Sequence, residues 1–282
     1  MARALAEGSQ RHRLEWLPFG FNPSICGREV LIRTANYDLD AMPADWKPDT
    51  VNYLYDLDTK ARTEVVDRHA SSTVFRNGLE DGRMFRFVGR RAALFSGLFH
   101  NTSPDGKWVV IRNTMTLIPD LETPHEVIYY HTNRRREKNW MPLVDDDRLY
   151  VLYNTRPWEV CELFPDGSMA TVRTGPGLDE WWSGSSNFVP YRGMWLGVLH
   201  RRRGEDVKHY YEHAWVLMDG AFGLVDVSPV WHFHARHVEL CCGLQWDGEE
   251  LCLSYGVHDR NAFLLWVGLP GSPNARHSSS NR

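Results

Sequence analysis

Long apolar runs, paired cysteines and a targeting signal are all missing from this chain of 282 residues. No apolar run approaches the roughly 20 residues that a membrane-spanning helix needs, so we expect no membrane span. The five cysteines include no Cys-x-x-Cys pair, which argues against a disulfide framework and against a structural zinc site. Residues 1–13 are charged and polar without an apolar centre, unlike a secretory signal, and we expect a cytoplasmic protein.

An excess of positive charge is missing as well. The 36 Asp and Glu residues outnumber the 32 Lys and Arg residues, and the net charge of −4 argues against nucleic acid as a partner. The chain has no Gly-x-Gly-x-x-Gly motif, no Gly-x-x-x-x-Gly-Lys-Ser/Thr motif and no Gly-x-Ser-x-Gly motif. We therefore propose no serine nucleophile and predict that the protein needs no cofactor.

Short strand-like runs, separated by turn signals, occur along the whole chain. Trp108–Ile118 and Tyr210–Met218 are examples of the runs, and Pro165-Asp166-Gly167 and Asp219-Gly220 are examples of the turns. No segment has a helical period of about 12 or more residues. Roughly fourteen strands predict an all-β fold and are too many for a simple sandwich. They suit a five-bladed β-propeller, although no clean repeat marks the blade boundaries.

The predicted propeller is a single domain over residues 16–270. Polar composition predicts flexible tails over residues 1–15 and 271–282. The twelve tryptophans are an unusually large number, and most should pack between sheets. Five of them stand in polar or glycine-rich surroundings, and we expect some of these to face a cleft: Trp140, Trp158, Trp181, Trp182 and Trp231.

Two segments place several kinds of polar side chain close together. Gly78–Arg83 has two carboxylates between glycines and then an arginine, and Glu137–Trp140 places an acid, a base, an amide and an indole in a row. Sugars are bound by such mixtures, because carboxylates and amides bind hydroxyls, a flat ring covers a pyranose face, and a cation binds phosphate. The alternative for Gly78–Arg83 is a polar turn before a strand over Met84–Val88. The alternative for Glu137–Trp140 is an exposed ion pair beside a packed tryptophan.

Several segments in order resemble the five-bladed β-propeller proteins around glycoside hydrolase family 130, which include β-mannoside phosphorylases and related mannosyl-transferring enzymes. The segments that carry this resemblance are Asn22–Ile25, Ile32–Tyr37, Asn52–Leu54, Gly78–Arg83, Glu137–Pro142, Ser183–Pro190, Leu196–His200 and Ser254–Arg260. They span roughly residues 20–268. Each is weak alone, and together they are moderately specific.

The resemblance implies inverting transfer of a mannose-type glycosyl group, with Asp81 as the catalytic acid and Glu80 beside it. This chain has Gly82 where the family usually has proline, which removes a fixed backbone angle next to Asp81. The implied partner of the sugar is inorganic phosphate or a nucleotide sugar, and the candidate cations for either are Arg33, Arg83, Lys138 and His200. The full set of predicted substrate-binding residues is Arg33, Asn36, Arg83, Glu137, Lys138, Asn139, Trp140, His200, Asp259 and Arg260.

Some of these assignments have plain alternatives. Asp259 and Arg260 also fit an ion pair within one loop, and His200 also fits an ordinary histidine at a strand end. His232 and His234 share one face of an extended chain, yet no cysteine or carboxylate pattern completes a ligand set around them. We therefore predict no metal site.

Three other functions are compatible with the same fold. One is a protein-interaction scaffold, which would have a flat, apolar top face in place of a carboxylate-lined cleft. A glycoside hydrolase would need a second carboxylate, roughly 6.5–9.5 Å from the acid, to activate water. A glycan-binding propeller without catalytic activity would keep the cleft, and the glycine at position 82 favours it. The sequence indicates neither the sugar linkage nor the oligomeric state.

Overall fold

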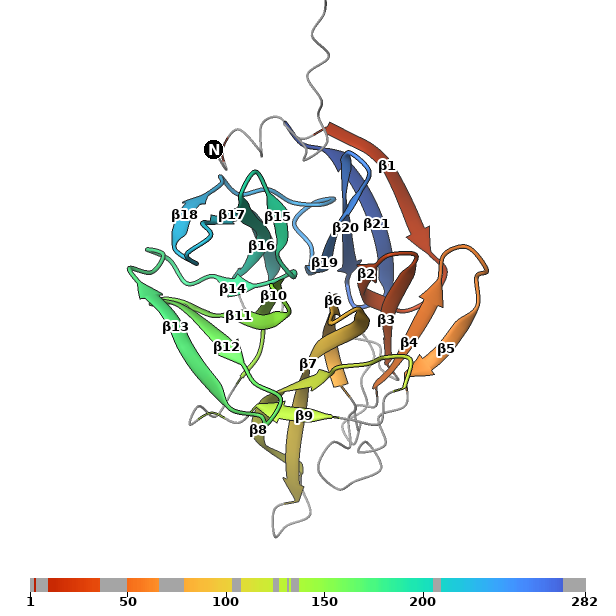
Figure 1. Ribbon diagram of the computed structural model, residues 1–282. Coiled ribbons are helices and arrows are strands. Elements are labelled where there is room, and N and C mark those ends of the chain that lie inside the picture. Colours follow the sequence, from red (N-terminus) through yellow and green to blue (C-terminus); the bar gives the residue numbers. More distant parts are fainter. Residues whose placement is uncertain are drawn as a thin grey trace, which may run out of the picture.

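The computed structural model describes residues 10–35, 50–65, 79–102, 108–123, 127–130, 137–204 and 209–270, together with residues 3 and 132. Their strands form five antiparallel sheets, which stand as blades around a central channel (Figure 1). The predicted all-β, five-bladed β-propeller is confirmed. Among the described residues, no helix has the length and apolar character to cross a membrane.

Each blade has its innermost strand at the channel. From the channel outward, the first blade contains β2 (Phe21–Cys26), β3 (Glu29–Ala35), β4 (Thr50–Asp56) and β5 (Arg62–Val65). The second contains β6 (Leu79–Phe87), β7 (Arg90–Thr102), β8 (Trp108–Ile118) and β9 (Ile128–Tyr130). The third contains β10 (Met141–Asp145), β11 (Arg148–Thr155), β12 (Trp158–Leu163) and β13 (Met169–Gly175).

The last two blades are less regular. In the fourth, β14 (Ser183–Gly184) and β15 (Val189–Tyr191) both pair with β16 (Met194–Arg203), and β17 (Tyr210–Met218) and β18 (Leu224–Val227) follow. The fifth contains β19 (Glu239–Asp247), β20 (Glu250–Val257), β21 (Asn261–Gly268) and β1 (Gln10–Leu17).

The ring is closed by the two ends of the described chain. Strand β1 pairs with β21 from Gln10↔Gly268 to Leu17↔Ala262, so the first strand of the sequence is the outermost strand of the last blade (Figure 1). Residues 10–15 therefore belong to the propeller, and our prediction of a tail over these residues was wrong. Residues 10–15 are polar because β1 is an edge strand, which pairs with a neighbour on one side only. The predicted tail over residues 271–282 lies outside the described residues.

In the part of the chain that the structure describes, the core consists of five apolar clusters, one between each pair of neighbouring blades. Trp140 packs between blades two and three, Trp158 between three and four, Trp215 between four and five, and Trp266 between five and one. Each sheet buries both faces against its neighbours, which explains why the chain needs so many large aromatic side chains.

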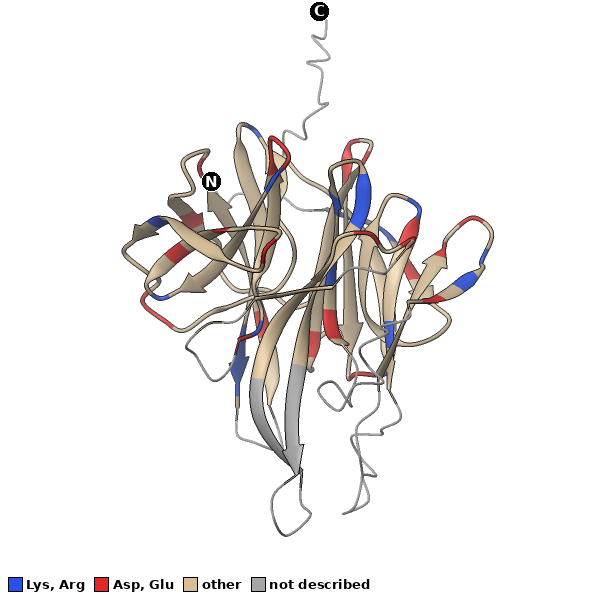
Figure 2. Cartoon of the chain, turned by 60° about the horizontal axis from the view of Figure 1, so that its bottom comes forward, with Lys and Arg blue, Asp and Glu red and all other residues tan. Residues whose placement is uncertain are grey.

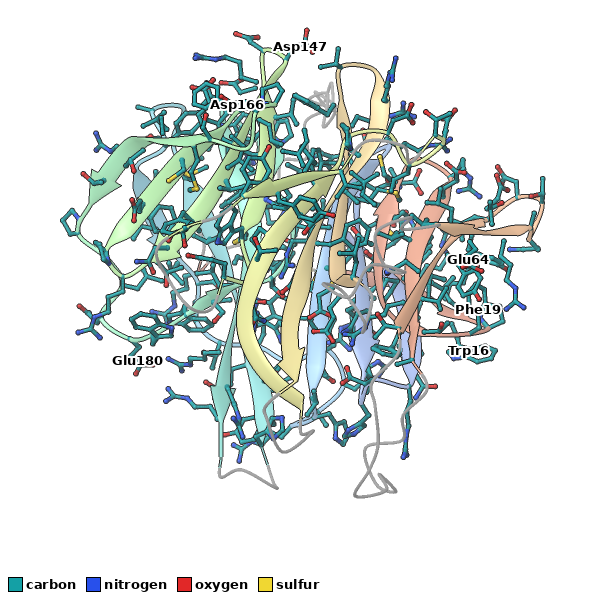
Figure 3. The ribbon with its side chains drawn as sticks, turned by 90° about the horizontal axis from the view of Figure 1, so that it is seen from below. Trp16, Phe19, Glu64, Asp147, Asp166 and Glu180 are labelled. Carbon is teal, nitrogen blue, oxygen red and sulfur yellow. The ribbon has the colours of Figure 1, made fainter. Side chains whose placement is uncertain are left out.

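The innermost strands all run in the same direction along the channel. Their C-terminal ends line one mouth, where Cys26, Arg86, Val144 and Trp246 come together. The turns that carry Asp147 and Asp166 lie at one end of the molecule in Figure 3, and Glu180, in the connection that leads into blade four, lies toward the other. The N-terminal ends of the inner strands therefore form the opposite mouth, together with the β11–β12 and β20–β21 turns among the described connections.

Candidate functional site

Polar side chains converge at this N-terminal mouth. A pocket of about 260 Å³ is lined there by Asn22, Arg33, Glu80, Asp81, His209, Tyr211, Val238, Leu240 and Asp259, and we call it the carboxylate pocket. Asn22 and Asp81 lie at the start of inner strands in two blades, and Asp259 lies in the β20–β21 turn of a third. In Figure 2 most of the charged segments lie on turns and outer strands. Some acidic segments lie among the strands in the middle of the view.

Asp81 is aimed into the pocket by an irregularity of its strand. The register of β6 shifts between Glu80 and Arg83, and Asp81 has a φ of 49°, which is uncommon for a residue with a side chain. Its Oδ1 accepts hydrogen bonds from Nδ2 of Asn22 at 2.9 Å and from a guanidinium nitrogen of Arg33 at 3.0 Å. A backbone conformation of this kind persists only where contacts around it stabilise it, and these two hydrogen bonds stabilise it here.

Asn22 connects two carboxyl groups from distant parts of the sequence. Its Nδ2 also lies 3.5 Å from Oδ1 of Asp259. Asn22 has a φ of 47°, at a register shift in β2 that matches the one in β6. Sequence reasoning did not assign Asn22 to the site. The available signal was a polar residue at the start of an inner strand, a position that Asp81 and Asn139 share.

The pKa values of the two aspartates are shifted in opposite directions. Burial opposes ionisation of Asp81, but Arg33, Arg83 and the hydrogen bond from Asn22 outweigh it and lower the pKa of Asp81. Burial raises the pKa of Asp259, and the negative charge of Asp81 raises it further. Asp81 is therefore the ionised carboxylate of the pair, and Asp259 holds a proton more readily. The acid role predicted for Asp81 conflicts with these electrostatics.

Glu80, which also lines the carboxylate pocket, is held by an ion pair with Arg33. Burial raises the pKa of Glu80, and the charge of Arg33 opposes this effect. A guanidinium nitrogen of Arg33 lies 2.6 Å from Oε1 of Glu80. Because a direct contact with a guanidinium favours the carboxylate form, Glu80 suits proton donation less well than Asp259.

Arg83 is a structural residue. Its side chain is fully buried, and its guanidinium donates to the carbonyl oxygens of Ser185 at 2.6 Å and Asp81 at 2.9 Å, and reaches Oδ1 of Asn139 at 3.4 Å. These bonds hold the inner strands of blades two, three and four together at the mouth. We therefore remove Arg83 from the candidate phosphate ligands.

His200 and Arg33 are also unsuited to bind a free anion. Burial, with the charges of Arg83 and Lys138, lowers the pKa of His200 to about 3, so this imidazole is neutral at physiological pH. Arg33 is engaged by two carboxylates. Of the four predicted cations, Lys138 alone is exposed and makes no ion pair among the described residues.

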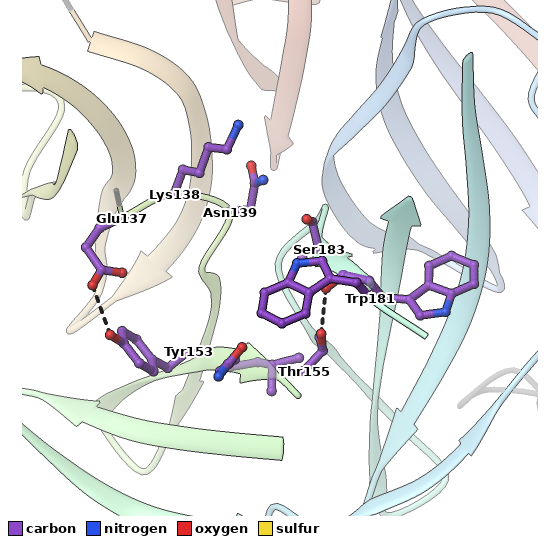
Figure 4. Close-up of a pocket in the computed structure, with 11 residues that line it drawn as sticks. Glu137, Lys138, Asn139, Tyr153, Thr155, Trp181 and Ser183 are labelled. Carbon is purple, nitrogen blue, oxygen red and sulfur yellow. Dashed lines mark hydrogen bonds between the residues drawn. The ribbon is translucent and has the colours of Figure 1, made fainter. Parts of the chain in front are cut away.

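The segment Glu137–Asn139 lines a second pocket of about 190 Å³, which we call the tryptophan pocket (Figure 4). Tyr153, Asn154, Trp181, Trp182 and Ser183 are among its other lining residues. The carboxylate of Glu137 accepts hydrogen bonds from Tyr153 at 2.9 Å, from the Trp140 indole at 3.2 Å and from Thr132. Glu137 therefore fixes the shape of the pocket wall.

Trp140 does not reach either pocket, and the sugar-stacking role that we predicted for it was wrong. Its ring is fully buried in the cluster between blades two and three, 5.1 Å from the ring of Tyr153. The inner strand begins immediately after it, and the apolar ring turns into the core. Trp181, which is 64% exposed, presents its indole at this mouth.

The remaining predicted residues are placed as follows. Arg260 is exposed and lines neither pocket, and its backbone N–H donates to Val257 O at 3.1 Å within the β20–β21 turn. Asn36 lies outside the described residues. No cluster of three or more His, Cys, Asp or Glu side chains that could hold a metal is found within the described ranges.

Gly82 is required by packing beside Asp81. A Cβ atom at this position would lie 2.5 Å from Cδ2 of Leu31 and 2.5 Å from Cε1 of Phe95, both buried. The proline of the resembling family therefore has no room here. Gly82→Ala should lower the free energy of unfolding by about 1–3 kcal/mol through overpacking. Gly220→Ala is the matched control, because a Cβ there meets nothing within 4 Å. Chemical denaturation would measure both, and a more stable Gly82→Ala variant would contradict the packing argument.

A scan against protein-family models and a search of curated protein sequences each found no match. Solved structures do match. The chain is similar to β-1,2-mannobiose phosphorylase from Listeria innocua in complex with β-1,2-mannobiose, with a TM-score of 0.57 and 14% identity over 90% of each chain. It is similar to a glycosyl hydrolase from Bacteroides ovatus, with a TM-score of 0.55 and 11% identity over 90% of this chain and 85% of that one.

A third similar structure is the GH43_1 enzyme from Xanthomonas citri complexed with xylose, with a TM-score of 0.50 and 14% identity over 94% of this chain and 92% of that one. The likeness is one of fold. It extends over nearly the whole chain and agrees with the β-propeller that the sequence predicts.

Proposed function

We propose that this protein is a carbohydrate-active enzyme that transfers a mannose-type glycosyl group with inversion. The observation that carries the proposal is the pair Asp81 and Asp259, which share the amide of Asn22 and have pKa values shifted in opposite directions. Two acids whose surroundings separate their pKa values are typical of active sites in which one group donates a proton and the other stabilises charge. The aromatic and amide groups nearby suit a sugar.

From the directions of these pKa shifts we propose a role for each aspartate. Asp259 donates its proton to the departing glycosidic oxygen, directly or through a substrate hydroxyl. Asp81 remains ionised and stabilises the positive charge that develops at the anomeric carbon. Arg33 holds Asp81 and Glu80 in place on the other side of the pocket.

The charges at the mouth favour an anionic nucleophile over water. Lys138 is exposed in the wall of the neighbouring tryptophan pocket, and its ammonium would attract phosphate. Phosphate brings its own nucleophilic oxygen, so no carboxylate has to take a proton from water.

Hydrolysis by the same fold is the second candidate. Two of the similar structures are named as a glycosyl hydrolase and as a GH43_1 enzyme that binds xylose. The mannose-type sugar rests on the resemblance of the sequence motifs and on the β-1,2-mannobiose phosphorylase among the similar structures. A non-catalytic glycan-binding propeller would retain both pockets and show no turnover.

A product assay tests the proposal. The protein would be incubated with β-mannosides with and without phosphate, and with GDP-mannose plus mannose, and the products would be identified by mass spectrometry and NMR. Formation of α-mannose 1-phosphate, or of an extended mannoside, supports glycosyl transfer with inversion. Free sugar in the absence of phosphate would favour the hydrolase. No product from any mixture, with sugar binding intact, would favour the glycan-binding propeller.

A further inference from the structure

The tryptophan pocket is separate from the carboxylate pocket but opens at the same mouth. The two pockets share no lining residue. Arg83 joins them, because its guanidinium contacts the main chain of Asp81 at 2.9 Å and the side chain of Asn139 at 3.4 Å. The charge of Lys138, in the wall of the tryptophan pocket, also acts on Glu80 in the carboxylate pocket. The two pockets are therefore neighbours at one mouth, as subsites for two linked units would be.

Trp181 is held in an exposed position by its neighbours. Trp182 is buried, its carbonyl accepts a hydrogen bond from Thr155 at 2.5 Å, and the guanidinium of Arg201 lies 4.5 Å from its ring centre. On the other side, Glu180 forms ion pairs with Arg201 and with Arg203, the latter at 2.9 Å. The backbone on both sides of Trp181 is thus anchored. An exposed indole on an anchored segment loses little conformational freedom when it binds a ligand.

The groups around this indole have the chemistry of a sugar site. Lys138 and Asn139 lie on one side of the pocket, and Trp181 and Ser183 lie on the other (Figure 4). An indole face covers the C–H face of a pyranose, while ammonium, amide and hydroxyl groups bind its hydroxyls. The carboxylate of Glu137 already accepts three hydrogen bonds from protein donors, which hold it in the pocket wall. The pocket is therefore suited to binding a sugar.

We infer that the tryptophan pocket binds a second sugar residue of the substrate, stacked on Trp181, while the residue that reacts lies in the carboxylate pocket. This inference rests on the proposed function and adds to it that the protein acts on a saccharide of at least two residues. Trp181 is then a specificity-determining residue. It selects for chain length and takes no part in proton transfer.

Binding measurements on wild type and three variants test the inference. Isothermal titration would use mannose, glucose and xylose, the β-linked disaccharides built from them, and GDP-mannose. Trp181→Ala should weaken disaccharide binding about tenfold or more, the usual loss when an aromatic side chain that the ligand covers is truncated. It should change monosaccharide binding less than about twofold. Trp181→Phe should restore most of the affinity. Trp16→Ala is the matched control, because Trp16 is 56% exposed on β1, outside both pockets.

The outcomes separate this inference from the proposed function. Disaccharide affinity unchanged in Trp181→Ala would overturn the second sugar site and leave the glycosyl-transfer proposal intact. An equal loss of affinity for monosaccharides and disaccharides would also overturn it. The indole would then contribute to one sugar site only, or to the stability of the fold. If Trp181→Ala weakened only the binding of GDP-mannose, the pocket would bind the nucleoside and not a second sugar, which would also overturn the inference. If wild type binds no saccharide at all, the inference and the proposed function both fail.

Discussion

Asp259→Asn should lower kcat for glycosyl transfer by about 10²–10⁴-fold, the usual loss when a general acid is removed. Asp81→Asn should cause a loss of similar size, because it removes the negative charge that stabilises the developing cation. Both variants should still bind sugar, since asparagine keeps the shape of the side chain. Asp147→Asn is the control, because Asp147 lies in the β10–β11 turn, outside both pockets. Steady-state rates would contradict these roles if either site variant kept more than about a tenth of wild-type activity.

The pH profile assigns the two roles separately. The pKa of Asp259 is raised, so wild-type activity should fall on the alkaline side as this proton is lost. The pKa of Asp81 is lowered, so activity should fall on the acid side only as pH drops through that depressed value. In Asp81→Asn the repulsion that raises the pKa of Asp259 is gone. The alkaline limit of its residual activity should therefore move to lower pH, and an unmoved limit would exclude Asp259 as the acid.

Arg33→Met should lower the free energy of unfolding by about 3–5 kcal/mol, the usual cost of leaving a buried charge without its partner. Arg33 is buried and contacts Glu80 at 2.6 Å and Asp81 at 3.0 Å, so its removal leaves two carboxylates unpaired. Arg28→Met is the matched control. Arg28 and Asp58 form an ion pair whose side chains are 56% and 61% exposed, and its loss should cost less than about 1 kcal/mol.

The same variant should change how stability depends on pH. In wild type the lowered pKa of Asp81 contributes stability above its unfolded pKa, and this contribution is lost as pH falls through the folded value. Without Arg33 the folded pKa values of Asp81 and Glu80 rise. The destabilisation should then be largest at neutral pH and should shrink under acid conditions, where both carboxyls are protonated. Urea unfolding at several pH values measures this, and a loss independent of pH would point to packing alone.

Strand patterns and turn residues are local properties of a sequence, and they were sufficient to predict an all-β propeller. The sequence predicted the innermost strands β6 and β19 and the outermost strands β9 and β18. It missed other innermost and outermost strands, namely β1, β2, β5, β10, β13, β14 and β15. β2 contains Pro23 and a register shift, and β13 is exposed along most of its length, so neither shows the alternation of a half-buried strand. β1 was missed because its partner, β21, lies at the other end of the sequence.

Part of the site was also predictable from the sequence. Glu80, Asp81 and Asp259 stand in short segments whose composition and resemblance both indicated a sugar site, and the structure brings them into one pocket. The sequence determined which residue types are available at the mouth, because the start of each inner strand and the turns around it are local features. Asn139 and Lys138 follow the same rule in the third blade.

Only the tertiary structure decided how those residues divide their tasks. Asn22 and Asp259 are separated by 237 positions, and closure of the ring brings them together. The same closure buries Arg83 among backbone carbonyls and makes it structural. Burial between blades removes Trp140 from the site, while the anchored connection into blade four presents Trp181. Burial and proximity across blades also set the pKa values of the carboxyl groups, and neither can be read from the order of residues.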